Sequence, residues 1–197
     1  SNSTHFRRGY RTCRPPSSPQ MAGSWGISLP RPRPRRRSRM QGAIHSINVS
    51  GSGGVPKMSV KAAMIGFEGL EGDYNRFRTE RKSGDPGRAV CIFSLERIRE
   101  LQSEGHPIDV GTAGENLTIE GLDWPSLRVG MTLRVGDASI RLSEPCAPCS
   151  KIGGSFQGED FSRVDHEKRE GWSRWSASVV EEGSVSVSDS VYLMDSQ

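Results

Sequence analysis

Long apolar runs are missing from this sequence of 197 residues. No stretch approaches the roughly 20 apolar residues that a membrane-spanning helix needs, and nothing resembles the apolar segment of a secretory signal. We therefore expect a cytoplasmic protein with no membrane partner. Cysteine is also scarce, with four residues of which only Cys146 and Cys149 are close together. This excludes the dense disulfide framework of a small secreted protein, and we expect reduced thiols.

Acidic residues and lysine are absent from residues 1–40, which contain ten arginines and six of the twelve prolines. The tail thus carries +10, and because the whole chain carries +4, residues 41–197 carry −6. The basic pI of about 9.1 therefore belongs to the tail. A folded region that is mildly acidic argues against a nucleic-acid-binding core.

The composition of residues 1–40 predicts a disordered Arg/Pro-rich segment, since it holds too little apolar surface to offset the entropy of ordering. It can be a polybasic arm for nucleic acid or a membrane surface, a nuclear-import signal, or a non-native extension upstream of Met40. A transit peptide fits its arginine and serine content, but the prolines would break the amphipathic helix that such a peptide needs. We expect nucleic acid as a partner only if the tail is native.

Residues 41–197 predict one β-rich domain. Strands are expected near residues 43–49, 57–65, 89–93, 127–135, 138–142, 175–180, 184–187 and 190–194, from apolar alternation or short apolar runs bounded by turns. One clear helix follows Ser94, a good N-cap, and stops at Gly105 and Pro107. One or two helical turns are expected near residues 161–168. The fold class is therefore β-rich α+β, a barrel with one clear helix and short peripheral helical turns.

The segment of residues 69–88 is polar, rich in glycine and longer than an ordinary connection, which is typical of functional loops. Five cationic residues lie in it, and guanidinium groups bind anions through paired hydrogen bonds. The alternative is a solvated loop in which these charges pair with Glu71, Glu80 and Asp85. The cations are Arg76, Arg78, Arg81, Lys82 and Arg88.

A second polar turn, residues 111–119, contains Gly114, Glu115 and Asn116. Asn both donates and accepts hydrogen bonds, and Glu can anchor backbone or activate water. Spacing alone carries little information here, because turns favour the same residue types.

The loop of residues 143–152 carries the clearest chemistry, because it places Cys146, Cys149 and Lys151 in a short stretch stiffened by prolines. A thiol reacts or binds metal as thiolate, and a nearby cation such as Lys151 favours that form. Cys149 is the leading candidate for the active residue.

Three other interpretations of the two cysteines remain open at this point. A dithiol redox motif requires a strand that leads into a helix in a βαβ layer, and the residues after Cys149 form no convincing amphipathic helix. Structural zinc lacks a second pair of ligands at the usual spacing. The third interpretation is a buried, inert pair. Cys91, inside an apolar run, is most simply a small core residue.

In order and spacing, several of these segments resemble the MOSC domain, the C-terminal domain of molybdenum cofactor sulfurases, and in particular its small stand-alone bacterial members. The resemblance runs from about Ile44 to Leu193. The matching segments are residues 49–56, 69–73, 85–90, 94–107, 114–118 and 148–152.

The resemblance implies a MOSC-type β-barrel and a site that holds the molybdenum cofactor (molybdopterin) or carries sulfur on one cysteine. Cys149 matches that cysteine and would be the molybdenum ligand, while Cys146 would resolve a persulfide or sulfenate on it or merely lie beside it. The loop arginines Arg76, Arg78 and Arg88 would bind the pterin phosphate. The remaining cofactor-binding candidates are Asp73, Gly114, Glu115 and Asn116, of which Glu115 and Asn116 would bond the cofactor or position the loop.

Three functions follow as hypotheses. The first is a molybdenum-cofactor oxidoreductase that reduces N-hydroxylated small molecules with electrons from a separate donor. The second is a sulfur carrier that takes a persulfide on Cys149 from a separate cysteine desulfurase, since no pyridoxal phosphate site is evident in this chain. The third is a nucleic-acid-binding module that uses the basic tail.

Overall fold

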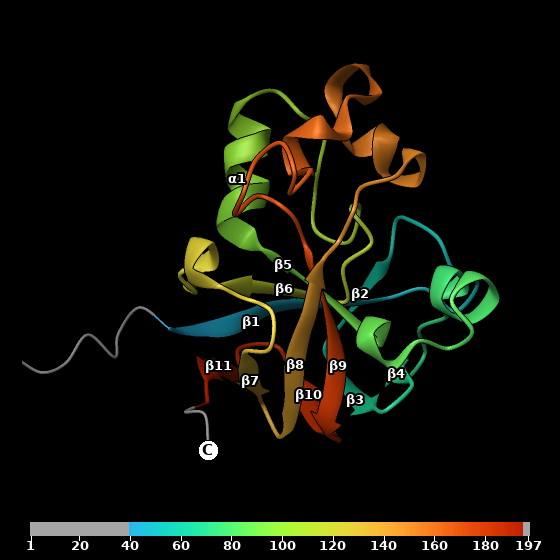
Figure 1. Ribbon diagram of the computed structural model, residues 1–197, viewed down its shortest axis with the longest axis vertical. Coiled ribbons are helices and arrows are strands. Elements are labelled where there is room, and N and C mark those ends of the chain that lie inside the picture. The colour runs from blue at the N-terminus through green and yellow to red at the C-terminus, as the bar shows by residue number, and fades with distance from the viewer. Residues whose placement is uncertain (1–39, 195–197) are drawn as a thin grey trace, which may run out of the picture. The chain divides into compact units, whose positions relative to one another are not determined.

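The computed structural model describes residues 40–194, so the expectations for residues 1–39 lie outside the described range. This part contains eleven strands and one α-helix (Figure 1). The strands are β1 (Gln41–Val49), β2 (Met58–Val60), β3 (Ala62–Gly66), β4 (Gly69–Leu70), β5 (Val90–Ser94), β6 (Leu117–Glu120), β7 (Thr132–Val135), β8 (Ala138–Pro145), β9 (Trp175–Glu181), β10 (Gly183–Ser186) and β11 (Ser190–Leu193).

Seven strands close into a barrel in the order β11-β7-β8-β9-β5-β6-β1, and β1 pairs back onto β11. All the barrel pairings are antiparallel except that of β5 with β6. Parallel neighbours need a crossover connection, and here the crossover contains helix α1 (Leu95–Ser103). The β-barrel predicted from the sequence is confirmed.

The barrel interior is filled by side chains that alternate along the strands. Leu133 and Val135 of β7 and Ile140 and Leu142 of β8 are buried, with Arg141 exposed between the last two. Apolar residues from the other strands, such as Ile92, complete the core. Side chains of both hydrophobic and small polar residues thus occupy the interior of the barrel.

The expected single strand over residues 57–65 is wrong, because the structure divides it at Lys61. β2 pairs with β1, whereas β3 joins a separate three-stranded sheet in the order β10-β3-β4. The first half of the segment is therefore paired with a strand of the barrel, and the second half belongs to a peripheral sheet. No local pattern marks this change of partner.

The hairpin before the cysteine loop is shorter than predicted on its first side. β7 begins at Thr132, and Gly130, with a φ of +86°, interrupts the alternation that starts at Leu127. The turn at Gly136 and Asp137 is confirmed, with Val135 opposite Ala138. β8 ends at Pro145, directly before Cys146.

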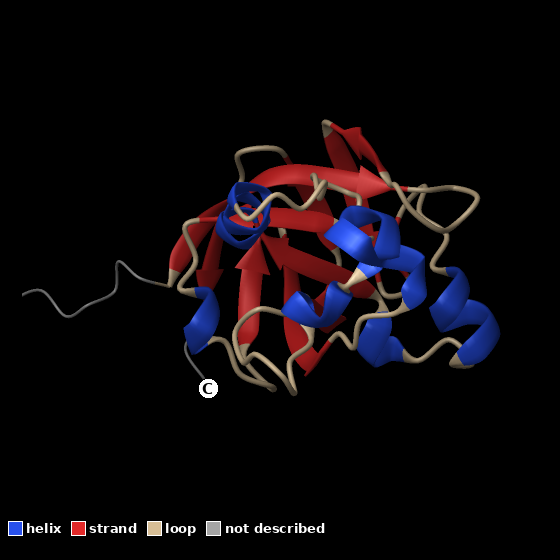
Figure 2. Cartoon of the chain, turned by 90° about the horizontal axis from the view of Figure 1, so that it is seen from above, coloured by secondary structure: helices blue, strands red, loops and turns tan. Residues whose placement is uncertain are grey.

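Helix α1 begins as predicted, because the Ser94 hydroxyl accepts a hydrogen bond from the Arg97 N–H at 3.3 Å. Short helical turns lie outside the strands of the barrel (Figure 2). They comprise Phe77–Arg81, Pro86–Arg88, Trp124–Ser126, Ser150–Ser155, Gln157–Glu159 and Phe161–Val164. Two of them, Phe77–Arg81 and Ser150–Ser155, flank the site described below.

Candidate active site

The cysteine loop is fixed at both ends. Cys146 directly follows β8, and its N–H donates to the carbonyl oxygen of Arg174 at 2.8 Å. Cys149 precedes the helical turn Ser150–Ser155, and its carbonyl oxygen accepts from the Ile152 N–H at 3.1 Å. Cys149 is exposed and Cys146 half-buried, so the two thiols of this loop have different environments.

Both thiols line a cavity of about 430 Å³ outside the barrel. The lining comes from the turn after β1, the loop of residues 74–88, strand β5, the turn at Ala113 and Gly114, the cysteine loop and the start of β9. Among residues 40–194, no carboxylate and six cationic side chains line it: Lys57, Arg76, Lys82, Arg88, Lys151 and Arg174. A cavity of this sign favours an anionic ligand.

A third thiol belongs to the same cavity. Cys91 of β5 lies beside the cysteine loop, and its Sγ is 3.7 Å from the Sγ of Cys146. Cys91 is half-buried between Val90 and Ile92, which are fully buried and point to the core. Since side chains alternate along a strand, Cys91 faces away from the core and into the cavity, contrary to the expectation that it is a core residue.

The two neighbouring thiols differ in acidity. The pKa of Cys146 is lowered to about 6, first by the hydrogen bond from Cys91 and, against the cost of burial, by the charge of Arg174 and by Ser176, whose Oγ lies at 3.1 Å. The pKa of Cys91 is raised well above its ordinary value, first because it shares that hydrogen bond and then because it is buried. Cys146 is therefore the thiolate of the pair and Cys91 holds the proton.

Arg174 supplies the buried positive charge of the site. Its Nη1 donates to the carbonyl oxygen of Ala113, while its buried Nε has no hydrogen-bond partner within residues 40–194. Burial opposes its charge, but the negative charges that Cys91, Cys146 and Glu115 carry once ionised raise its pKa above the ordinary value. The unused Nε leaves a donor for a ligand.

Most of the loop cations predicted from the sequence line the cavity. Arg76 donates to the Ser52 carbonyl oxygen at 2.8 Å and lies 4.0 Å from Glu80. Arg88 forms ion pairs with Glu144 and with Asp85, whose Oδ2 lies 3.4 Å from the Arg88 Nε, and this buried Nε makes no hydrogen bond within the described chain. Two alternatives were considered for this loop, an anion-binding surface and a set of charges paired with carboxylates. Arg76 and Arg88 combine both, because each lines the cavity and is also paired with a carboxylate.

Two other predicted residues also line the cavity. Lys151 does so from the turn after Cys149. Gly114 has a φ of +83°, and a Cβ at this position would lie 3.1 Å from the Cγ1 of Val55. The turn is thus confined to glycine by backbone conformation and close packing.

Asp73 does not line the cavity. Its carboxylate accepts from the Ser50 N–H at 2.8 Å, from the Lys57 Nζ at 2.7 Å and from the Asn116 Nδ2 at 2.9 Å. All of these are internal bonds between distant segments. Asp73 therefore braces the loops that surround the site.

Arg78 is likewise turned inward, with 4% of the residue exposed. Its Nε donates to the Asp85 carbonyl oxygen at 2.9 Å, and its Nη1 pairs with Glu68 at 2.8 Å. The guanidinium thus closes the loop of residues 78–85 on itself instead of facing the cavity.

Glu115 and Asn116 are buried and position backbone, one of the two roles considered for them. Glu115 accepts from the Gly111 N–H at 2.6 Å and from Thr118 at 3.1 Å, and burial raises its pKa. Asn116 accepts from the Cys91 N–H at 3.1 Å. Together they hold the turn and the strand from which the cavity is built.

The family assignment rests on a direct comparison. The sequence model of the MOSC domain matches residues 79–192, more than half of the chain. The chain belongs to the MOSC domain family. The resemblance noted in the sequence is confirmed, and β1, which closes the MOSC barrel, lies before the matched range.

Relatives of this MOSC chain include small bacterial proteins. It is 31% identical over 138 residues to the protein YiiM of Escherichia coli and 30% identical over 137 residues to the uncharacterised protein YflK of Bacillus subtilis. These matches cover 67% and 68% of this chain and 59% of each relative. The crystal structure of Escherichia coli YiiM is similar, with a TM-score of 0.58 and 26% identity over 80% of this chain and 71% of that one.

The residues that line this cavity and were missed from the sequence include Lys57, Cys91, Arg174 and Ser176. For Cys91 the available signal was alternation, since its apolar neighbours occupy the core-facing positions of β5. Arg174 and Ser176 flank Trp175 at the start of β9, and the same alternation puts both on one side. Their proximity to the cysteine loop depends on the pairing of β8 with β9, which no local pattern specifies.

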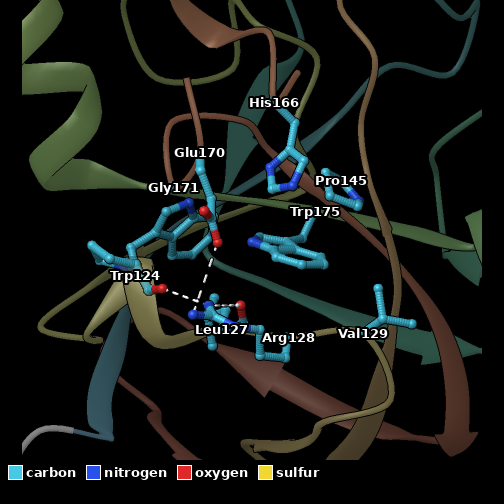
Figure 3. Close-up of a pocket in the computed structure, with 10 residues that line it drawn as sticks. Trp124, Leu127, Arg128, Val129, Pro145, His166, Glu170, Gly171 and Trp175 are labelled. Carbon is cyan, nitrogen blue, oxygen red and sulfur yellow. Dashed lines mark hydrogen bonds and ion pairs between the residues drawn. The ribbon is translucent and has the colours of Figure 1, made fainter. Parts of the chain in front are cut away.

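The MOSC fold of this chain has a second cavity, of about 200 Å³, across strand β9 (Figure 3). Trp175 and Pro145 line it, whereas their neighbours Arg174, Ser176 and Cys146 line the first cavity. The ends of β8 and β9 thus form a wall between an aromatic cavity and a cationic, thiol-lined one. The thiols and most of the cations line the latter, which makes it the candidate functional site.

Within residues 40–194, the structure has no helix that is long and apolar enough to span a membrane.

Proposed function

We propose that this MOSC domain protein binds the molybdenum cofactor and reduces N-hydroxylated compounds. The observation that carries the proposal is that an exposed thiol, Cys149, lies at the wall of the larger cavity. Among the described residues, six cations and no carboxylate line this cavity. The chain spans about three fifths of the length of its curated relatives. The proposal therefore rests on the residues of this chain and not on the activity of those relatives.

The residues fit the chemistry of the cofactor. A thiolate is a soft donor suited to molybdenum, which assigns Cys149 as the metal ligand. The pterin phosphate is an anion, and the buried Nε of Arg174, which makes no hydrogen bond within residues 40–194, is a donor at the same cavity, where Arg88 adds a second guanidinium. Arg76 adds a third guanidinium at the cavity wall. When bound, the cofactor supplies a metal centre that exchanges two electrons with the substrate.

The chain itself contributes binding, orientation and charge. Reduction of an N-hydroxy group consumes two electrons and two protons and yields an amine and water. Lys151, two residues after Cys149, adds a cation to the cavity wall. Tyr74 and Phe77 present aromatic surface to the cavity for an uncharged part of the substrate. A separate electron donor must complete the cycle.

Elemental and pterin analysis tests the proposal. Protein purified from a host that makes the cofactor should contain about one molybdenum and one pterin per chain. Cys149→Ser should lose most of the molybdenum, while Cys13→Ser, which changes a thiol outside the described residues, should retain it. Full molybdenum content in Cys149→Ser would refute the ligand assignment.

A sulfur carrier is the second candidate, favoured by the presence of three thiols on one cavity. In this case Cys149 receives a persulfide from a cysteine desulfurase and passes it to a metal–sulfur acceptor. Mass spectrometry after incubation with a desulfurase should then find one added sulfur atom on Cys149. Protein that stays unmodified while a known acceptor is charged would count against this function.

The nucleic-acid hypothesis concerns residues 1–40, of which residues 1–39 lie outside the described structure. If the tail binds nucleic acid, the affinity should fall steeply with salt and be lost when these residues are removed. Salt-insensitive binding by residues 40–197 would exclude it.

A further inference from the structure

Strand β9 brings Cys91 and Cys146 together. Ser176 of β9 lies opposite Cys91 on one side and opposite Glu144 on the other, so β5 and the end of β8 flank the same point. The two sulfur atoms are 3.7 Å apart and both line the cavity. Among the sulfur atoms of residues 40–194, this is the pair in hydrogen-bond contact.

We propose that Cys91 and Cys146 are a redox-active dithiol that delivers two electrons to the cavity and is restored by an external dithiol. The inference rests on the proposed reductase function and supplies the donor that the reduction requires. It also assigns Cys91, and not Cys149, as the partner of Cys146.

The reaction balances. The Cys146 thiolate and the Cys91 thiol lose two electrons and one proton as an S–S bond forms between them. The N–O bond of the substrate takes up these electrons with two protons, one from Cys91 and one from solvent, breaks, and gives an amine and water. An external dithiol then reduces the protein disulfide by exchange through a mixed disulfide and is itself oxidised to a disulfide.

The surroundings suit the two partners to different roles. Cys146 has Arg174 and Ser176 beside it, which stabilise a thiolate, whereas Cys91 lies within a strand and keeps its proton. Bond formation must shorten the separation from 3.7 Å to about 2 Å. The backbone N–H groups of both residues are held by hydrogen bonds, so side-chain rotation must supply this change. Cys149 remains free to serve as the metal ligand.

Disulfide mapping tests the pair directly. Full-length protein carrying Cys13→Ser is reduced, oxidised with one equivalent of diamide, and digested without reductant. The expected product is a cross-linked peptide joining Cys91 to Cys146, with two of three thiols lost and both recovered with dithiothreitol. Cys149→Ser should give the same cross-link and Cys91→Ser should not. A cross-link between Cys146 and Cys149, or none at all, would overturn the inference.

A second measurement separates this inference from the proposed function. Reduced protein loaded with cofactor is mixed anaerobically with benzamidoxime and no other reductant. One disulfide should form for each amidine produced. Amidine formed with every thiol intact would overturn the dithiol and leave the proposed function standing. A cross-link in protein that takes up no cofactor would instead overturn the proposed function.

Discussion

Asn116 is hydrogen-bonded to both peptide groups of Cys91. Its backbone N–H donates to the Cys91 carbonyl oxygen at 2.7 Å, and its side-chain oxygen accepts from the Cys91 N–H at 3.1 Å. The Asn116 Nδ2 donates a hydrogen bond to the Asp73 carboxylate at 2.9 Å. One buried side chain therefore links the strand that carries a thiol to the loop that carries the arginines.

Replacing Asn116 should destabilise the protein. Asn116→Ala removes the side-chain bonds and leaves the Cys91 N–H unpaired in a buried position, at a cost of about 2–3 kcal/mol. Asn116→Asp keeps the acceptor but places a second carboxylate against Asp73, so it should be at least as destabilising. Urea denaturation monitored by tryptophan fluorescence measures both. Stability equal to wild type in either variant would contradict the bracing role.

The reactivity of Cys146 should depend on pH with a midpoint near its pKa of about 6. Alkylation requires the thiolate, so the rate rises as pH increases through 6 and levels off above it. Cys91→Ala removes the largest cause of the lowered pKa and should move the midpoint upward. Peptide mass spectrometry after timed iodoacetamide treatment resolves Cys146 from the other thiols. An unchanged midpoint in Cys91→Ala would rule out the shared hydrogen bond.

Arg88 and Arg78 form a matched pair for the loop. Arg88 lines the cavity, so Arg88→Gln should reduce cofactor content by about tenfold with little change in unfolding free energy, since its carboxylate partners are partly exposed. Arg78 is internal, so Arg78→Gln should cost about 1–2 kcal/mol and expose the loop to proteases. Pterin content and limited proteolysis distinguish the two effects. The reverse assignment of phenotypes would show that Arg78 holds the ligand.

The ion pair of Lys57 and Asp73 should be essential for stability. Its atoms are 2.7 Å apart, and the side chains are 8% and 4% exposed. Lys57→Met leaves a buried carboxylate without its cation, at a cost of about 3 kcal/mol. The double variant Lys57→Met with Asp73→Asn should recover part of this loss. Calorimetric melting of the three variants checks the prediction, and additive losses would exclude coupling between the two residues.

Local sequence patterns were sufficient for part of the structure. Alternation located β7 and β8 and the start of β9, and Ser94 marked the start of α1 because its hydroxyl is the cap. The division at Lys61 was not predictable, since β2 and β3 look alike in sequence but pair with strands that are far apart along the chain.

The sequence was sufficient to predict the chemistry of the candidate site, a thiol beside cations, but only some of the residues that line it. The pattern around Cys149 and the arginine-rich loop identified the cavity wall, but could not separate Arg88, which faces the cavity, from Arg78, which does not. That difference depends on the direction of each side chain in an irregular loop. Cys91 and Arg174 join the site through strand pairings that link residues more than 50 positions apart.

The pairing of β1 with β11 has a consequence for biosynthesis. Gln41 lies opposite Tyr192, so the barrel cannot close until about 150 further residues have left the ribosome. Contacts of such long sequence separation slow folding to milliseconds or longer. During translation the start of β1 thus presents an unpaired edge, which is the kind of surface that chaperones shield from aggregation.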